Sequence, residues 1–186
     1  SQSFLVDLEA RDAIVAAGSA AHGETVLEIG PGLGTLTEGL LATGAHVVAI
    51  ELDDDLLPRL QERFAAEIAA GQLTLVHGDA LNVDLEPLLP ASGGWRVIAN
   101  IPYHITSPLL HRLLLLPNPA QRIVLLVQRE VAERIAAEVG DWSYLTAFVQ
   151  ARTSASIVAR VPREAFDPVP GVDSAILLLE HRTGDD

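Results

Sequence analysis

Short apolar blocks alternate with amphipathic stretches along most of the chain. Five blocks are rich in β-branched residues and bounded by Gly, Asp or Asn, as buried parallel strands are: 26–29, 47–50, 73–76, 97–99 and 123–127. Helical periodicity fills the intervals, at 33–43, 53–70, 107–116 and 129–137. This alternation predicts a doubly wound α/β sheet with helices on both faces.

The C-terminal third departs from this rhythm. Two apolar segments, 155–161 and 174–180, have no helical pattern between them, so we expect them to pair antiparallel at the edge of the sheet. The Pro-rich stretch 166–171 between them cannot be a helix or a central strand and is predicted to be an ordered loop. The sequence therefore predicts a Rossmann-like fold with a mostly parallel, seven-stranded sheet.

Composition limits the class of protein. The 186 residues are 49% hydrophobic and 20% charged, with mean hydropathy +0.30, which is enough apolar material for one domain spanning 1–186. Aliphatic runs such as 113–116 are far too short to cross a bilayer, and no charged-then-apolar leader opens the chain. We expect a soluble, cytoplasmic monomer without membrane contact. The absence of cysteine excludes disulfides and thiolate metal sites.

The net charge of −13 looks unfavourable for a nucleic-acid partner, because lysines and arginines supply most non-specific affinity. The charge is uneven, however: three of the twelve basic residues lie within 1–95 and nine within 96–186, and all are arginines. Guanidinium groups suit phosphate contacts and base stacking. A general compositional preference for arginine explains the pattern equally well.

A glycine-rich turn follows the first strand, with Gly30, Gly32 and Gly34 in alternate positions and Glu28 two residues before them. Such a turn lets a ligand approach the backbone. The spacing differs from the G-x-G-x-x-G of dinucleotide folds. It suits S-adenosylmethionine, whose amino-acid end has an ammonium group for an acid to attract and no pyrophosphate. A purely structural turn is the alternative.

The next two strands also end in acids. Glu51 lies 21 residues beyond Gly30, where doubly wound folds place a carboxylate on ribose hydroxyls. Asp79 ends the third strand, where it is expected to accept a hydrogen bond from the adenine amino group of the cofactor. Taken singly, each acid is also compatible with a solvated strand end. Together they indicate one site, because ligands in such sheets bind beyond the carboxyl ends of the strands.

Asn-Ile-Pro-Tyr at 100–103 follows the fourth strand and is the most specific signal. The amino nitrogen of adenine is a poor nucleophile because its lone pair is delocalised into the ring. If the Asn100 side chain and a backbone carbonyl near Pro102 accept its two hydrogens, the nitrogen can direct its lone pair at a sulfonium methyl without an obligatory general base. Pro102 stiffens the turn and Tyr103 offers a ring to stack on the base. The alternative is an Asn-capped turn before a helix at Ser107.

Over nearly its whole length the chain resembles the ribosomal RNA adenine dimethyltransferase family. The segments that carry the resemblance are 2–7, 28–32, 100–108, 128–135 and 166–174. The resemblance implies a class I methyltransferase that uses S-adenosylmethionine and no metal. It implies that Tyr103 and Phe166 sandwich the target adenine, although Phe166 could instead be a core aromatic. The expected catalytic residues are Asn100, Pro102, Tyr103 and Phe166, and the expected cofactor pocket comprises Gln2, Ser3, Leu5, Glu28, Gly30, Gly32, Glu51, Leu52, Asp79, Ala80 and Asn100.

Ser107-Pro108 after the catalytic motif, together with segment 166–174, resembles the family's enzymes that dimethylate adenine N6 in small-subunit ribosomal RNA, which implies action on an immature subunit. The alternatives are a large-subunit enzyme of the macrolide-resistance type and a non-catalytic RNA-binding module. Two features depart from the family: Ser3 replaces an expected Asn, and 140–146 lacks the usual Lys and Gly-Arg. The chain also ends soon after its last predicted strand, so we expect the family's helical C-terminal domain to be absent. An isolated catalytic domain should bind cofactor normally and RNA weakly.

Overall fold

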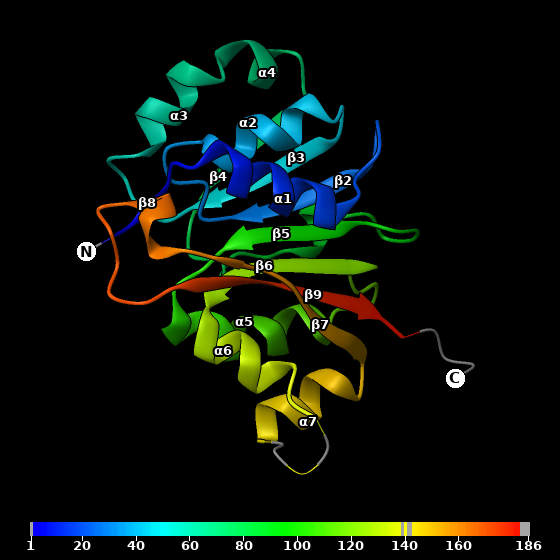
Figure 1. Cartoon of the computed structure of the whole chain (residues 1–186). Helices are drawn as coiled ribbons and strands as arrows, with labels where there is room; N and C mark the ends of the chain where they lie inside the picture. Colours follow the sequence, from blue (N-terminus) through cyan, green and yellow to red (C-terminus); the bar gives the residue numbers. More distant parts are fainter. Residues whose placement is uncertain (1, 139, 141–142, 183–186) are drawn as a thin grey trace.

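A seven-stranded sheet forms the centre of the protein in a computed structural model that describes residues 2–138, 140 and 143–182. Its strand order is β4-β3-β2-β5-β6-β9-β7 (Figure 1). The first five of these strands are parallel, and β9 is antiparallel to both neighbours. The bounds are β2 Thr25–Ile29, β3 His46–Glu51, β4 Leu73–His77, β5 Arg96–Asn100, β6 Arg122–Gln128, β7 Thr153–Val161 and β9 Ser174–His181. The predicted fold class and antiparallel edge are confirmed.

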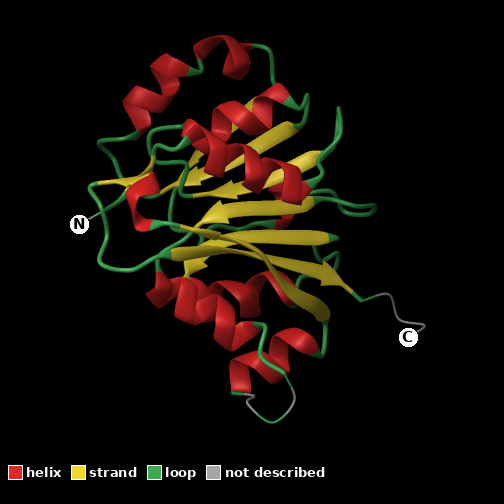
Figure 2. Cartoon of the chain, viewed as in Figure 1, coloured by secondary structure: helices red, strands yellow, loops and turns green. Residues whose placement is uncertain are grey.

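Helices cover both faces of this sheet (Figure 2). One face packs against α1 (Leu8–Gly18), α2 (Thr35–Ala42), α3 (Leu57–Arg63) and α4 (Ala65–Ala69), and the other against α5 (Tyr103–Leu114), α6 (Arg129–Ile135) and α7 (Tyr144–Gln150). Successive side chains of a strand point to opposite faces. In β5, Val97 and Ala99 therefore enter the α5–α7 core and Ile98 the α1–α4 core, and all three are fully buried. Burial on both faces explains the unbroken apolar runs.

Helices α1 and α7 were not predicted from the sequence, and three further elements differ from the prediction. The single helix predicted at 53–70 is two helices, because the chain breaks at Phe64, whose backbone (φ −111°, ψ 27°) is not helical. Helix α5 begins at Tyr103, four residues before the predicted start, with Pro102 as its N-cap. The prediction of a loop at 166–171 is wrong for its first two residues, because β8 (Phe166–Asp167) pairs antiparallel with β1 (Phe4–Leu5).

The pairing of β1 with β8 brings segments from the two ends of the chain's described part to one edge of the sheet. Figure 1 shows β8 and the N-terminal segment at the edge where the parallel strands have their carboxyl ends. This edge therefore collects the segments in which the sequence predicts a site.

Two short 3₁₀ helices, Glu86–Leu88 and Arg163–Ala165, lie in connecting segments. Among the described helices, none has the length and apolar character required to span a membrane.

Candidate active site

The glycine turn after β2 has a backbone that only glycine adopts readily. Gly30, Gly32 and Gly34 have φ values of 70°, 59° and 93°. A Cβ atom on Gly30 would lie 3.3 Å from the backbone oxygen of Asn100, and one on Gly32 would lie 3.0 Å from the ring of Phe4. The turn is therefore closely packed between the N-terminal segment and the end of β5. This packing explains why small residues occupy these positions.

Glu51 connects the glycine turn to the end of β3. Its side chain is almost fully buried, and its two oxygens accept hydrogen bonds from the backbone amides of Gly32 and Asp53, each at 3.0 Å. The sequence predicts this residue as a ribose ligand, and its position beside the turn is compatible with that role. The structure adds a second task, because the carboxylate already holds two backbone segments in place. Leu52, which follows it, is 64% exposed.

Asp79 lies in the loop after β4, at the same edge. Its two carboxylate oxygens accept hydrogen bonds from the Leu81 amide (2.9 Å) and the Asn82 side chain (3.0 Å). The amide of Gly78 donates to the backbone oxygen of Glu51 at 3.0 Å, which ties this loop to the end of β3. Ala80 is buried. Glu28, Glu51 and Asp79 thus lie at or just beyond the ends of three adjacent parallel strands.

Glu28 is fully buried beneath the glycine turn. Its Oε1 accepts a hydrogen bond from the hydroxyl of Thr37 in α2, and within the described chain its Oε2 has no hydrogen-bond partner. The pKa of Glu28 is raised to about 8: burial raises it most, the Thr37 hydrogen bond lowers it, and the negative charge of Glu51 raises it. Glu28 is therefore mainly protonated at neutral pH. Thr37 is a site residue that the sequence analysis missed, although its position one turn into the following helix could have indicated it.

The Asn-Ile-Pro-Tyr segment leaves β5 beside the glycine turn, since Ala99 pairs with Ile29 of β2. Asn100 is partly exposed, and within the described chain its side chain makes no hydrogen bond to protein. The Pro102 carbonyl accepts two long hydrogen bonds from the first turn of α5, from the Ile105 amide and the Thr106 hydroxyl, both at 3.3 Å. The Tyr103 side chain lies outside the described residues, so its predicted stacking role stays a prediction.

The N-terminal segment meets the Pro-rich segment at this edge. Leu5 pairs with Phe166 and both are buried, while Gln2 is exposed and Ser3 is partly buried. The burial of Phe166 agrees with the alternative that it is a core aromatic. Its predicted contact with the target base remains a prediction. The structure thus brings the predicted cofactor residues near the start of the chain to the predicted base-binding residue near its end.

A groove of about 430 Å³ opens at the same edge, where β6 ends and β9 begins. It contains two arginines and three acids among its lining residues, which are Gln128, Arg129, Glu130, Pro162, Arg163, Glu164, Gly171, Val172 and Asp173. Both arginines are half-exposed and lie near acids, with Arg129 3.5 Å from Glu133 and Arg163 3.5 Å from Glu164.

No group of three or more His, Cys, Asp or Glu side chains in the described part of the chain could hold a metal ion.

A mostly parallel sheet with an antiparallel edge, a glycine turn and three strand-end acids define a Rossmann-like methyltransferase fold. The family model for ribosomal RNA adenine dimethylase matches residues 1–186. A small-subunit ribosomal RNA methyltransferase A from Clostridium botulinum is 38% identical over 181 residues, which cover 96% of this chain and 65% of the relative. The chain belongs to the ribosomal RNA adenine dimethylase family.

Solved structures agree with this assignment. A dimethyladenosine transferase from Plasmodium falciparum has a TM-score of 0.84 and 34% identity, covering 96% of this chain and 63% of that one. The 23S rRNA methyltransferase ErmE has a TM-score of 0.84 and 30% identity, covering 97% and 70%. The chain thus spans about two thirds of the length of the proteins it matches.

Proposed function

We propose that residues 1–186 act as the catalytic domain of an S-adenosylmethionine-dependent enzyme that methylates the N6 amino group of adenines in small-subunit ribosomal RNA, giving dimethyladenosine. The observation that supports this most directly is the position of Asn100. It leaves β5 next to the glycine turn, and its amide has no protein partner within the described chain. Family membership and the small-subunit relatives support the choice of substrate.

The residues present fit the proposed cofactor. The glycine turn has no Cβ atoms to keep a ligand away from its backbone, and the buried Oε2 of Glu28 lacks a partner that an ammonium group, or a water held by one, could supply. Glu51 ends β3 and Asp79 follows β4, in the order that suits ribose and adenine. When bound, S-adenosylmethionine supplies an electrophilic methyl group on its sulfonium sulfur.

Catalysis would then rest on positioning and on fixed dipoles. The Asn100 side-chain oxygen and a carbonyl of the Ile101–Pro102 turn would accept the two amino hydrogens of the target adenine. This arrangement localises the nitrogen lone pair and directs it at the methyl group. Because α5 begins immediately after Pro102, the turn is held by a helix whose inner face is buried. The adenine must leave any base stack to enter, as in other enzymes that modify bases.

We also propose that the substrate is an immature small subunit and that the protein acts as a cytoplasmic monomer. The test is transfer of labelled methyl from S-adenosylmethionine to small subunits that lack the modification, with methylated adenosines mapped by mass. We expect Asn100→Ala to lower transfer by about 10²- to 10³-fold with an unchanged thermal midpoint. Gln121→Ala removes an exposed amide at the opposite edge of the sheet and serves as control.

Two results would overturn the proposal. The first is absence of transfer to any RNA from a chain that binds the cofactor, because this would leave a binding module. The second is wild-type transfer by Asn100→Ala. Preferential transfer to large-subunit RNA would replace the small-subunit assignment with the 23S activity that the ErmE structure is named for.

A further inference from the structure

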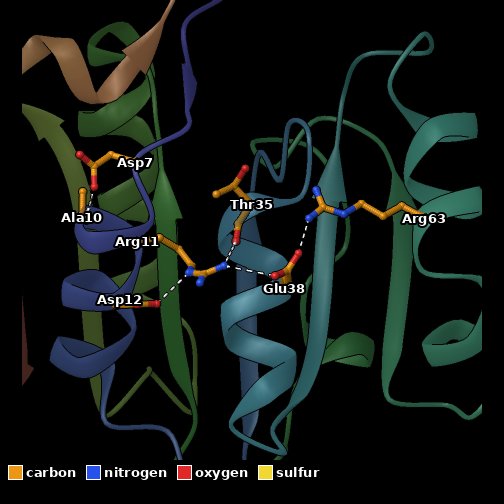
Figure 3. A network of polar contacts seen from close by, with 7 residues as sticks. All are labelled: Asp7, Ala10, Arg11, Asp12, Thr35, Glu38 and Arg63. Atoms are coloured by element: carbon orange, nitrogen blue, oxygen red, sulfur yellow. Dashed lines mark hydrogen bonds and ion pairs between the residues drawn. The ribbon is translucent and has the colours of Figure 1, made fainter.

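Three segments of the predicted cofactor pocket are each followed by a helix. The N-terminal segment leads into α1, the glycine turn into α2, and the Glu51 strand end into α3. One side chain from each helix takes part in a shared set of ion pairs: Glu38 of α2 pairs with both Arg11 of α1 and Arg63 of α3 (Figure 3). We call these three residues the Arg-Glu-Arg relay. It therefore joins the supports of all three segments.

Glu38 is the centre of the relay. Its Oε1 lies 3.5 Å from Nη1 of Arg11, and its Oε2 is bonded to Nη2 of Arg63. The one carboxylate therefore bridges two guanidinium groups from helices on either side of α2 (Figure 3). Arg11 is mostly buried, whereas Arg63 and Glu38 are partly exposed. The shared carboxylate makes the positions of α1 and α3 depend on each other.

Both arginines also bind the backbone of the turn and of the helix it opens. Nη1 of Arg63 donates to the Leu33 carbonyl at 2.6 Å, and Nη1 of Arg11 donates to the Thr35 carbonyl at 3.3 Å. Leu33 lies between Gly32 and Gly34, so the first contact is made inside the glycine turn itself. The guanidinium groups thus hold the turn directly, in addition to joining the helices.

The turn has a backbone hydrogen bond of its own, from the Gly34 amide to the Pro31 carbonyl at 2.9 Å, and its further support comes from outside. Helix α2 has Gly34 as its N-cap, with a positive φ and, among the described residues, no side-chain hydrogen bond to cap the helix. Glycine is also the residue with the greatest backbone freedom. A Cβ on Gly34 would lie 2.6 Å from the Phe64 ring and 3.1 Å from Nη1 of Arg63, which shows how closely the end of α3 packs against the turn.

We propose that the Arg-Glu-Arg relay is a positioning device that holds the glycine turn, the N-terminal segment and the Glu51 loop in the arrangement that binds S-adenosylmethionine. This inference rests on the proposed use of that cofactor. The three residues act through the backbone of Leu33 and Thr35 and are not catalytic residues. Loss of the relay should leave the fold intact, because partly exposed ion pairs contribute little to stability, but it should loosen the cofactor site before binding.

The test compares Glu38→Gln with Glu180→Gln in the whole chain. Glu180 has a side chain of similar exposure to Glu38 (50% against 56%) and pairs with Arg122 at the far edge of the sheet, so it is a matched control. Calorimetric titration with S-adenosylmethionine and S-adenosylhomocysteine is done at a temperature where every variant is folded. We expect Glu38→Gln to weaken binding about three- to tenfold and Glu180→Gln to leave it unchanged, with thermal midpoints alike.

A second readout follows the turn without ligand. Amide hydrogen exchange at residues 32–35 should be faster in Glu38→Gln than in wild type and unchanged in Glu180→Gln. Arg63→Lys retains a charge for Glu38 but cannot make both Arg63 contacts, so its affinity should fall between those of wild type and Arg63→Ala. In a double-mutant cycle, the effects of Glu38→Ala and Arg63→Ala on cofactor affinity should be non-additive, because the two side chains act as one unit.

The outcomes separate the two proposals. Cofactor affinity and turn exchange of Glu38→Gln equal to those of Glu180→Gln would overturn the relay while leaving the proposed function intact. A fall in thermal midpoint that accounts for all loss of binding would also overturn it, since the role would then be structural. Failure of the wild-type chain to bind either compound would overturn the proposed function, and the relay would then be judged by the exchange of the turn amides.

Discussion

Replacing Glu28 by glutamine should stabilise the protein at neutral and alkaline pH and do little near pH 5. The Glu28 carboxyl is fully buried, accepts a hydrogen bond from Thr37, and lies near the negative charge of Glu51. Burial raises its pKa to about 8, against 4.5 for an unburied glutamate. The folded state therefore binds a proton that the unfolded state releases above pH 4.5. A glutamine side chain has nearly the shape of the protonated carboxyl and carries no titratable group.

The sign and size of the effect follow from linkage. A group whose pKa is raised on folding contributes stability that is fully present below the unfolded pKa and is lost as pH rises toward the folded pKa. For Glu28 this window runs from pH 4.5 to about 8. Each unit within it is worth about 1.4 kcal/mol, so the wild type should lose on the order of 2 kcal/mol relative to Glu28→Gln between pH 5 and pH 7.

The assay is urea unfolding of both proteins at pH 5, 6, 7 and 8, with the free energy of unfolding taken from the midpoint and slope. The difference between the two proteins should grow with pH up to about 8 and then level off. A difference that stays constant across this range would refute the reasoning, because it would show that Glu28 has the same protonation in both states. If the difference instead became smaller as pH rises, the pKa of Glu28 would be lower in the folded state than in the unfolded state, as for an ionised carboxylate paired with a cation.

The remaining predictions concern the turn and the two cores. Thr37→Val removes the hydrogen bond that lowers the Glu28 pKa. In urea unfolding, the pH at which the stabilising effect of Glu28→Gln levels off should therefore be higher in this background. Gly34→Ala forces a side chain into a backbone with φ +93° against the Phe64 ring; it should cost about 1–3 kcal/mol in urea unfolding and weaken cofactor binding in calorimetry. Trp95→Phe leaves the Asn118 carbonyl without its 2.9 Å donor and should cost about 1–3 kcal/mol by the same unfolding measurement.

The central strands were predictable because their signal is local. Strands β2, β3, β5 and β6 are short apolar runs buried on both faces, and parallel order then aligns the strand ends at one edge. The positions of Glu51, Asp79 and Asn100 at that edge follow from the same rule. The antiparallel pair β7 and β9 was also predictable, because no helix pattern separates the two segments.

Other features depend on contacts that the sequence does not display. Helix α1 was missed because its alanine-rich sequence has few large apolar residues, and its main anchor is the single fully buried Ile14. The pairing of Leu5 with Phe166 joins segments from opposite ends of the described chain. The break at Phe64 arises because that ring packs against Gly34, which propensity cannot indicate. Tertiary contacts decided each of these cases.

The two acids beside the glycine turn illustrate why position along a strand does not settle a residue's chemistry. Glu28 and Glu51 both occur near the end of a buried strand, and sequence alone predicts a ligand-binding carboxylate for each. Glu51 has two backbone amides to satisfy its oxygens, whereas Glu28 has one hydroxyl and an unpartnered oxygen within the described chain. Two adjacent buried charges of the same sign would repel each other, and protonation of Glu28 removes that repulsion. If the proposed cofactor binds here, its ammonium group would favour the charged form of Glu28.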